Sequence, residues 1–433
     1  MSIGLIGFIA ALILLMILVY KKLNLVIVSL ICCIVVALTS RMPILETLQN
    51  DYMQGFAEFI INNFLLFTLS AVFGKVMEES GAAAAFAKVI YKACGPRWAV
   101  FGVMAATALL VYGGVSNFVV VFTVFPIFLV VFKEANLPIK LIPGIIFAAS
   151  ATFAASMLPG TPALNNIIPT QYLGTTPTAA PLVGIVTSIV TIVLIVVYFE
   201  YEFRRAKAKN EGFVPNEKAK EQMARMEGRK EVNPVLSVLP MIALVVCLNI
   251  FGMDILVALV IAILMVLVFF YKNIGNKTEC MTEGISSASS AIINTSAAVG
   301  FGSVVKATAA FTAMVNSLMG LGGNPLISLG LITTIISGIT GSGTGGIGIF
   351  MQVFADRFLE LGVNPEIMHR IVAIASNGLD SLPHNGLVIT VILACGCTHK
   401  ESYKPIFVTS VVITCIALAI SIVMGMALYP IGA

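Results

Sequence analysis

Hydrophobic residues run along this chain in segments long enough to cross a lipid bilayer, separated by shorter polar stretches. A transmembrane helix needs about 20 consecutive apolar residues, and segments of roughly that length recur throughout, which gives about ten crossings in all. The uninterrupted spans are predicted at residues 3–20, 23–39, 57–78, 179–200, 234–251, 253–271, 287–319 and 405–428. The pattern therefore predicts an all-α membrane protein.

Four further apolar segments are interrupted by glycine or proline. They cover residues 96–133, 141–173, 326–360 and 367–395. The first and third break at Gly113–Asn117 and Gly341–Gly346, and the second and fourth break near Pro159 and Pro383. The halves of the first and third segments are too short to cross comfortably, which favours re-entrant hairpins. The other two segments are predicted to be interrupted helices.

The same string of breakers occurs twice. Phe73-Gly74 recurs as Phe301-Gly302, 228 residues later, and the two glycine-rich breaks are separated by the same 228 residues. Each half then makes five crossings, and because five is odd, the second half is inverted relative to the first. The predicted fold is two inverted repeats of five transmembrane helices, each with a re-entrant hairpin and one interrupted helix. The predicted parts are a first repeat at 1–200, a connector at 201–233 and a second repeat at 234–433.

Composition and charge place these segments in a membrane and orient them. Of 433 residues, 59% are hydrophobic and 11% are charged, against roughly 25% charged in soluble domains. With the polar stretch 202–233 in the cytoplasm, most loop lysines and arginines fall inside, and only Arg41, Arg357 and Arg370 fall outside. We expect a multi-pass protein of the bacterial inner membrane with both termini outside. The first span lacks a basic leader and a clear cleavage site, so we expect it to be retained.

The net charge of +4 comes from basic residues between the spans, so it gives no indication of nucleic-acid binding. The eight cysteines are scattered through apolar stretches without the spacing of zinc ligands. They are interpreted as small buried hydrophobic residues. We therefore expect no metal site, no cofactor and no nucleic-acid partner.

The glycine-rich breaks carry the candidate chemistry. Paired interruptions in two matching halves indicate a transporter site near the bilayer midplane. Backbone amides at the start of a half-helix attract a carboxylate, and small polar side chains add donors without fixed charge. Tight packing of small residues is the structural alternative, and it is favoured for Ser286-Ser287 and Ser289-Ser290. The predicted substrate-binding residues are Gly114, Ser116, Asn117, Thr161, Ser342, Gly343, Thr344, Asn377 and Asn385.

Charged residues at membrane depth are a second set of functional candidates, because burying a charge there is costly. Asp380 and His384 flank Pro383 about one helical turn apart, so they are either a proton-coupling pair or a structural pair that holds the break together. Lys306 lies 228 residues after Glu78. These opposite charges suggest either an anion or proton relay, or a charge pair within each repeat.

Three strings resemble the GntP family of bacterial carboxylate permeases, over nearly the whole chain: Gly74–Gly81, Gly113-Gly114 and Leu382–Gly386. The last is most similar to the branch named for 3-hydroxybutyrate permeases. The resemblance implies a proton-coupled importer of small hydroxy-acid anions with the plan of the ion-transporter superfamily, including a dimeric scaffold and an elevator-like transport domain. Related dicarboxylate carriers grip the carboxylate with Ser-Asn-Thr at both tips. The departures at Ser116–Phe118 and Ser342–Thr344 favour a monocarboxylate.

The sequence thus predicts a secondary active transporter that imports small hydroxy-carboxylates by alternating access, coupled to protons and assembled as a homodimer in the bilayer. A sodium-coupled symporter for carboxylates, hydroxy acids or amino acids is the main alternative. A membrane-embedded hydrolase using Ser342 and His384 is weaker, because Thr340 stands where the Gly-x-Ser-Gly string needs its first glycine. A passive channel does not require paired hairpins. No enzymatic activity is expected.

Overall fold

The computed structural model describes residues 3–21, 23–112, 117–161, 163–226, 232–313 and 323–431. Within these residues the secondary structure is helical, as the apolar spans predict, and no strand occurs. The first part of the chain forms α1 (Ile3–Tyr20), α2 (Leu25–Ser40), α3 (Ile44–Glu46), α4 (Met53–Glu79), α5 (Ala82–Tyr112), α6 (Asn117–Glu134), α7 (Ile142–Phe147), α8 (Phe153–Ser156), α9 (Leu164–Leu173) and α10 (Pro181–Ala208).

The rest of the chain repeats this alternation of long and broken helices. It forms α11 (Glu217–Met226), α12 (Pro234–Asn249), α13 (Ile255–Phe269), α14 (Lys277–Lys306), α16 (Pro325–Thr340), α17 (Gly343–Glu360), α18 (Pro365–Ser376), α19 (Gly386–Ala394), α20 (His399–Ile406) and α21 (Ile413–Leu428). Short 3-10 and π-helical turns join some of these elements: Thr47–Tyr52, Ile139–Leu141, Ala148–Thr152 and Phe407–Val412.

The predicted breaks in the two interrupted helices are confirmed. One helix ends at Ser156 and resumes at Leu164, and the other ends at Ser376 and resumes at Gly386. The helix break of the second hairpin is confirmed as well, because α16 ends at Gly341 with a left-handed φ of 59°, a conformation that glycine adopts at little cost. The tip of the first hairpin, residues 113–116, lies outside the described residues.

Two predicted boundaries are wrong. The segment expected to start at residue 96 begins at Ala82, and Gly95, with a φ of 71°, kinks it near the predicted start. The span expected to start at residue 287 begins at Lys277, because α14 continues through polar residues. Part of the connector is helical, since α10 extends to Ala208 and α11 follows. Both boundaries were drawn from hydropathy, which does not detect polar helical turns at the ends of a span.

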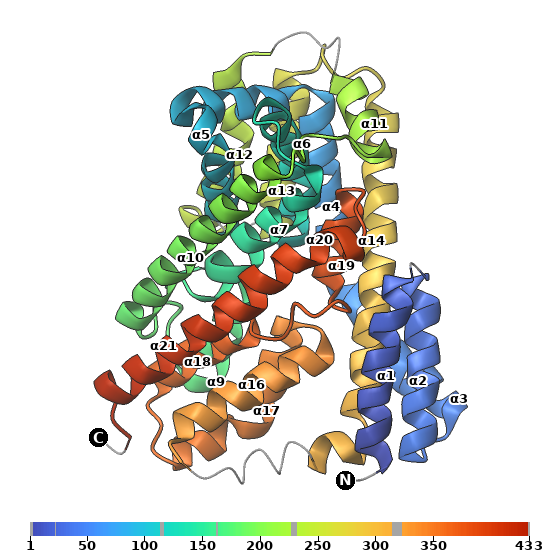
Figure 1. Cartoon of the computed structure of the whole chain (residues 1–433), viewed down its shortest axis with the longest axis vertical. Coiled ribbons are helices and arrows are strands. Elements are labelled where there is room, and N and C mark those ends of the chain that lie inside the picture. The colour runs from blue at the N-terminus through green and yellow to red at the C-terminus, as the bar shows by residue number, and fades with distance from the viewer. Residues whose placement is uncertain are drawn as a thin grey trace.

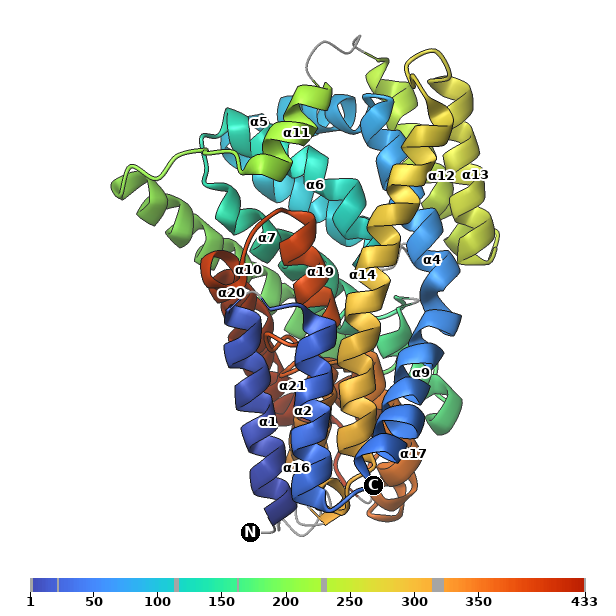
Figure 2. The ribbon, with the colours of Figure 1, turned by 90° about the vertical axis from the view of Figure 1, so that its right-hand side faces the viewer.

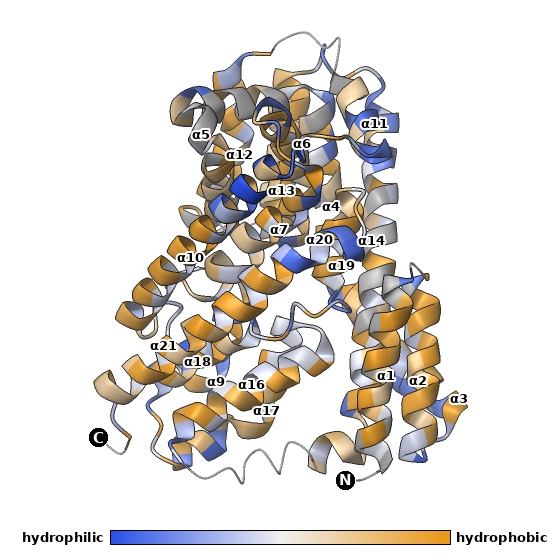
Figure 3. Cartoon of the chain, viewed as in Figure 1, coloured by the Kyte–Doolittle hydropathy of each residue, from blue (hydrophilic) through white to orange (hydrophobic). Residues whose placement is uncertain are grey.

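By length and composition, four helical segments of the described chain could each cross a membrane: Ile44–Met77, Ile139–Ser156, Pro181–Ala208 and His399–Leu428. Several shorter apolar helices accompany them. Hydrophilic segments gather around α11, whereas α10, α16 and α21 are mostly hydrophobic (Figure 3). Both termini lie at the end of the molecule opposite α11 (Figure 1).

Helices α4 and α14 pack along each other and form the centre of the molecule. Helix α2 packs against α14 and α13 packs against α4, at opposite ends of this pair (Figure 2). The hairpin α5–α6 lies toward the end with α11, and α16–α17 lies toward the other end (Figure 1).

The repeated Phe-Gly string marks close contacts between these long helices and the hairpins. A Cβ atom on Gly74 would lie 3.0 Å from the carbonyl carbon of Phe122 in α6, and one on Gly302 would lie 3.1 Å from the carbonyl oxygen of Thr340 in α16. Glycine at both positions therefore lets each long helix touch the backbone of the hairpin that follows it in the chain.

Candidate functional site

A cavity of about 880 Å³ lies between the α4–α14 pair, the inner ends of both hairpins and α9. Of the predicted substrate-binding residues, Asn117 at the start of α6 and Ser342 and Thr344 at the break between α16 and α17 line it. Lys306, the last residue of α14, also lines it and is exposed. The structure therefore brings residues from both halves of the chain to one polar-lined space.

The α4 side of this cavity was not predicted from the sequence. Glu58, Asn62 and Asn63 lie on α4 and line the cavity opposite the hairpin ends. Glu58 and Asn62 are one helical turn apart, so they lie on the same face of α4. The signal was present in the sequence as consecutive asparagines inside an apolar span, where polar groups indicate an aqueous pathway.

The two interrupted helices are bound to each other by asparagine side chains. The Asn165 side-chain amide donates to Ser376 Oγ and to Asn377 Oδ1, each at 2.9 Å. The Asn377 amide in turn donates to Ser156 Oγ at 2.8 Å and to the carbonyl oxygens of Ala151 and Thr152. Asn165 also lines the cavity. The bonds therefore fix the broken ends of both helices beside the site.

Asp380 lies directly behind the hairpin break. Its carboxylate is 9% exposed and accepts hydrogen bonds from the Ser381 hydroxyl at 2.9 Å and from the backbone amide of Gly343. His384 is also buried, but its Nε2 atom contacts the carbonyl oxygen of Gly338 at 3.0 Å. The structure thus gives Asp380 and His384 separate partners in place of the shared proton or water predicted for them.

Two more predicted residues support the site without lining it. Asn385 donates to the carbonyl oxygen of Gly341 at 3.0 Å and caps α19, which ties α19 to the hairpin break. The carbonyl oxygen of Thr161 accepts a hydrogen bond from Asn166 at 2.9 Å within the first interruption. Gly114 and Ser116 fall outside the described residues, as does the side chain of Glu78, whose backbone belongs to α4.

The assignment of Arg370 to an outer loop is wrong. Arg370 lies in α18 with 0% of its side chain exposed. Its guanidinium donates to the carbonyl oxygens of Ala179, Pro177 and Ser156 and to Asn166 Oδ1, at distances of 2.8–3.3 Å. Buried carbonyls need donors, so this side chain satisfies the non-helical segment after α8.

A methyl group on Gly343 is expected to damage the site. The added Cβ would lie 2.9 Å from Asn165 Nδ2, 3.0 Å from Asp380 Oδ2 and 3.1 Å from Asn377 Oδ1. All three side chains are hydrogen-bonded and would have to shift. We expect Gly343→Ala to lower the initial rate of substrate uptake by about tenfold or more, since small misplacements in a site are costly. Gly275→Ala is the control, because its Cβ would meet nothing within 4 Å, and equal rates for both variants would contradict this geometry.

Comparison with known proteins identifies the family. The sequence profile of CitMHS, described as citrate transporter, matches residues 12–272. The chain is also 32% identical over 453 positions to the uncharacterized transporter YxjC of Bacillus subtilis strain 168, covering 94% of this chain and 96% of that protein. The chain belongs to the CitMHS citrate transporter family. A solved structure, the YdaH transporter of Alcanivorax borkumensis, aligns with a TM-score of 0.48 and 16% identity, over 88% of this chain and 87% of that chain.

Membership of the citrate transporter family confirms a secondary transporter of the membrane and agrees with the absence of an enzymatic role. It does not confirm the GntP family or its 3-hydroxybutyrate branch, which stay predictions from sequence. Among the described residues, no group of three or more His, Cys, Asp or Glu side chains is placed to hold a metal ion.

Proposed function

We propose that this member of the citrate transporter family imports small hydroxy-carboxylate anions by alternating access. The observation that carries the proposal is the meeting of two interrupted helices and a hairpin break at one cavity, held by the Asn165–Asn377 hydrogen bond of 2.9 Å. Unwound backbone at such a position is tolerated where it lines a cavity and binds a solute.

The chemistry of the cavity favours an anion with hydroxyl groups. Ser342, Thr344 and Asn117 supply neutral hydrogen-bond donors, and Lys306 supplies a positive charge. Helix α17, 18 residues long, begins at Gly343 beside the cavity, and the amides at a helix start favour a carboxylate. The description of the family as a citrate transporter agrees with a hydroxy-carboxylate substrate.

Proton coupling through Asp380 is part of the proposal. A carboxylate buried without full solvation carries a large free-energy cost, which binding a proton removes. Asp380 contacts Gly343, the first residue of α17, so its protonation changes the charge directly behind the substrate cavity. Coupling to sodium is the alternative and would leave uptake independent of the proton gradient.

The inverted repeats, the domains at 1–200 and 234–433, the elevator motion and the homodimer are finer parts of the same proposal. Three observations support inversion: the hairpins lie toward opposite ends of the molecule, α2 and α13 pack at opposite ends of the α4–α14 pair, and both termini lie opposite α11 (Figures 1 and 2). The excess of basic residues in the connector supports a cytoplasmic α11, in a bacterial inner membrane.

Uptake by membrane vesicles tests this function. We expect saturable accumulation of one of a panel of labelled acids comprising citrate, gluconate, 3-hydroxybutyrate and malate, abolished by a protonophore at constant sodium. Ser342→Ala and Asn117→Ala are each expected to lower uptake about tenfold, the effect of losing one hydrogen bond of about 1.4 kcal/mol. Thr282→Ala, an exposed threonine of α14 outside both cavities, is the control. Uptake of no panel member, or wild-type rates in both variants, would refute the proposal.

A further inference from the structure

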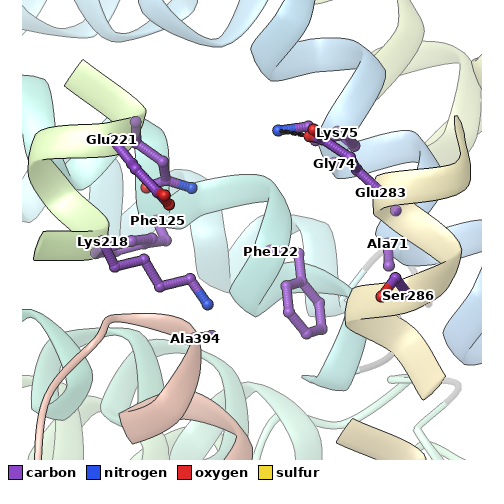
Figure 4. Close-up of a pocket in the computed structure, with 12 residues that line it drawn as sticks. Ala71, Gly74, Lys75, Phe122, Phe125, Lys218, Glu221, Glu283, Ser286 and Ala394 are labelled. Atoms are coloured by element: carbon purple, nitrogen blue, oxygen red, sulfur yellow. Dashed lines mark ion pairs between the residues drawn. The ribbon is translucent and has the colours of Figure 1, made fainter. Parts of the chain in front are cut away.

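A second, smaller cavity lies at the other end of the α4–α14 pair. Its volume is about 330 Å³, and its walls come from α4, α14, α6, α19 and the connector helix α11 (Figure 4). It is lined by the last part of α4 and the first part of α14. The large cavity is lined instead by the first part of α4 and the last part of α14. The two cavities therefore lie at opposite ends of one helix pair.

The linings of the two cavities correspond residue by residue. Five residues that line the small cavity have a partner in the lining of the large cavity at a constant separation of 228 positions, the separation at which the glycine-rich breaks recur. The corresponding pairs are Ala71 with Val299, Gly74 with Gly302, Lys75 with Ser303, Glu283 with Gly55, and Ser286 with Glu58. The small cavity thus occupies, in one half of the chain, the place that the substrate cavity occupies in the other.

We propose that the small cavity is the release site for the transported carboxylate at the α11 face of the protein. This inference rests on the proposed transport function and adds to it a second binding site with its own residues. A carrier that alternates between two faces binds its substrate from one side and releases it to the other. Equivalent surfaces of two inverted repeats provide the two routes.

The charges in the small cavity fit a carboxylate that exchanges with a resident one. Lys75 pairs with Glu283 at 2.9 Å and with Glu79 at 3.6 Å, and its side chain is 12% exposed. The Lys75–Glu283 pair connects α4 to α14 across the cavity (Figure 4). A substrate carboxylate can replace Glu283 on Lys75, because the Glu283 side chain is 41% exposed and can turn to water. The ion pair therefore acts as an exchangeable plug.

Helix α11 covers this site and contributes to it. Lys218, Glu221 and Gln222 of α11 line the cavity, and Lys218 points into it (Figure 4). Asn216, just before α11, donates to the carbonyl oxygens of Cys395 and Gly396 at 2.9 Å, which fastens α11 to the end of α19. Helix α11 belongs to the connector and has no counterpart in the repeats. Its presence accounts for a cavity smaller than the one at the opposite face.

Exchange kinetics measured separately at the two faces test the release site. Right-side-out and inside-out vesicles that hold the full-length protein would be loaded with the acid that the wild type accumulates. We expect Lys75→Gln and Lys218→Gln to raise the half-saturation concentration about fivefold to tenfold at the α11 face, the effect of losing one charged contact. The value at the opposite face should stay within about twofold of wild type, since neither lysine lines the large cavity.

Lys220→Gln is the matched control, because Lys220 lies on the same helix, is paired with Glu217 at 2.7 Å and is absent from the cavity lining. Lys218 is exposed, so its replacement tests the site even where Lys75→Gln fails to fold. Unchanged values at the α11 face, or equal increases at both faces, would overturn the release site while leaving transport itself intact. Failure of the wild type to accumulate any carboxylate would instead overturn the proposed function.

Discussion

Replacing Asp380 by asparagine is expected to abolish accumulation of substrate against its gradient while leaving exchange of substrate across the membrane. Asparagine keeps the shape of the side chain but cannot take up the coupling proton. The Ser381 and Gly343 donors that hold the carboxylate can still bond its amide oxygen. Accumulation depends on the proton, whereas exchange needs only the substrate-loaded carrier to change face. We expect the accumulation ratio to fall to about one, with exchange within about tenfold of wild type.

The control is Asp356→Asn on α17, because Asp356 is exposed and outside both cavities. Both variants would be measured in vesicles with an imposed pH gradient and then in equilibrium exchange without one. Accumulation by Asp380→Asn at the wild-type ratio would remove Asp380 from the coupling mechanism. Loss of exchange together with accumulation would indicate a structural role for this carboxylate.

Replacing Arg370 by methionine is expected to destabilise the whole fold. The guanidinium is fully buried and donates to carbonyl oxygens of Ala179, Pro177 and Ser156. Methionine fills similar space but leaves these acceptors without a donor. Removing one partner of a buried charged network costs about 3–5 kcal/mol, enough to lower the apparent melting temperature by at least about 5 °C.

Thermal unfolding of the purified protein in detergent, followed by loss of the monodisperse elution peak, measures this effect. Arg357→Met is the control, because the Arg357 side chain is 61% exposed and pairs with Glu360 on the surface. An exposed ion pair contributes about 0–1 kcal/mol, so this variant should melt close to wild type. A similar melting temperature for the two variants would show that the carbonyls around Arg370 find other donors.

The positions of the helix breaks could be predicted from sequence because glycine and proline determine them locally. The break at Gly341, both interruptions and the helical nature of the spans follow from backbone geometry and hydropathy alone. Gly343 could be assigned to the site for the same reason. Asn117, Ser342 and Thr344 were predicted by proximity to these breaks, and all three line the large cavity.

Features that depend on contacts between distant segments could not be predicted. Arg370 was placed in an outer loop because its neighbours in sequence suggest a helix start, whereas its partners lie near residues 156 and 179. Glu58 was missed because hydropathy averages its charge with the apolar residues around it. The Asn165–Asn377 bond joins positions 212 residues apart. No local pattern specifies which side chains meet over such distances.

The glycine contacts at positions 74 and 302 also bear on how the molecule can move. Where side chains of two helices interlock, displacement requires lifting each knob out of its hole. At Gly74 and Gly302 the long helices present bare backbone to the hairpins, so nothing protrudes to be lifted. Under the proposed alternating access, each long helix offers the adjoining hairpin a smooth track, and the energetic barrier to sliding along it is correspondingly low.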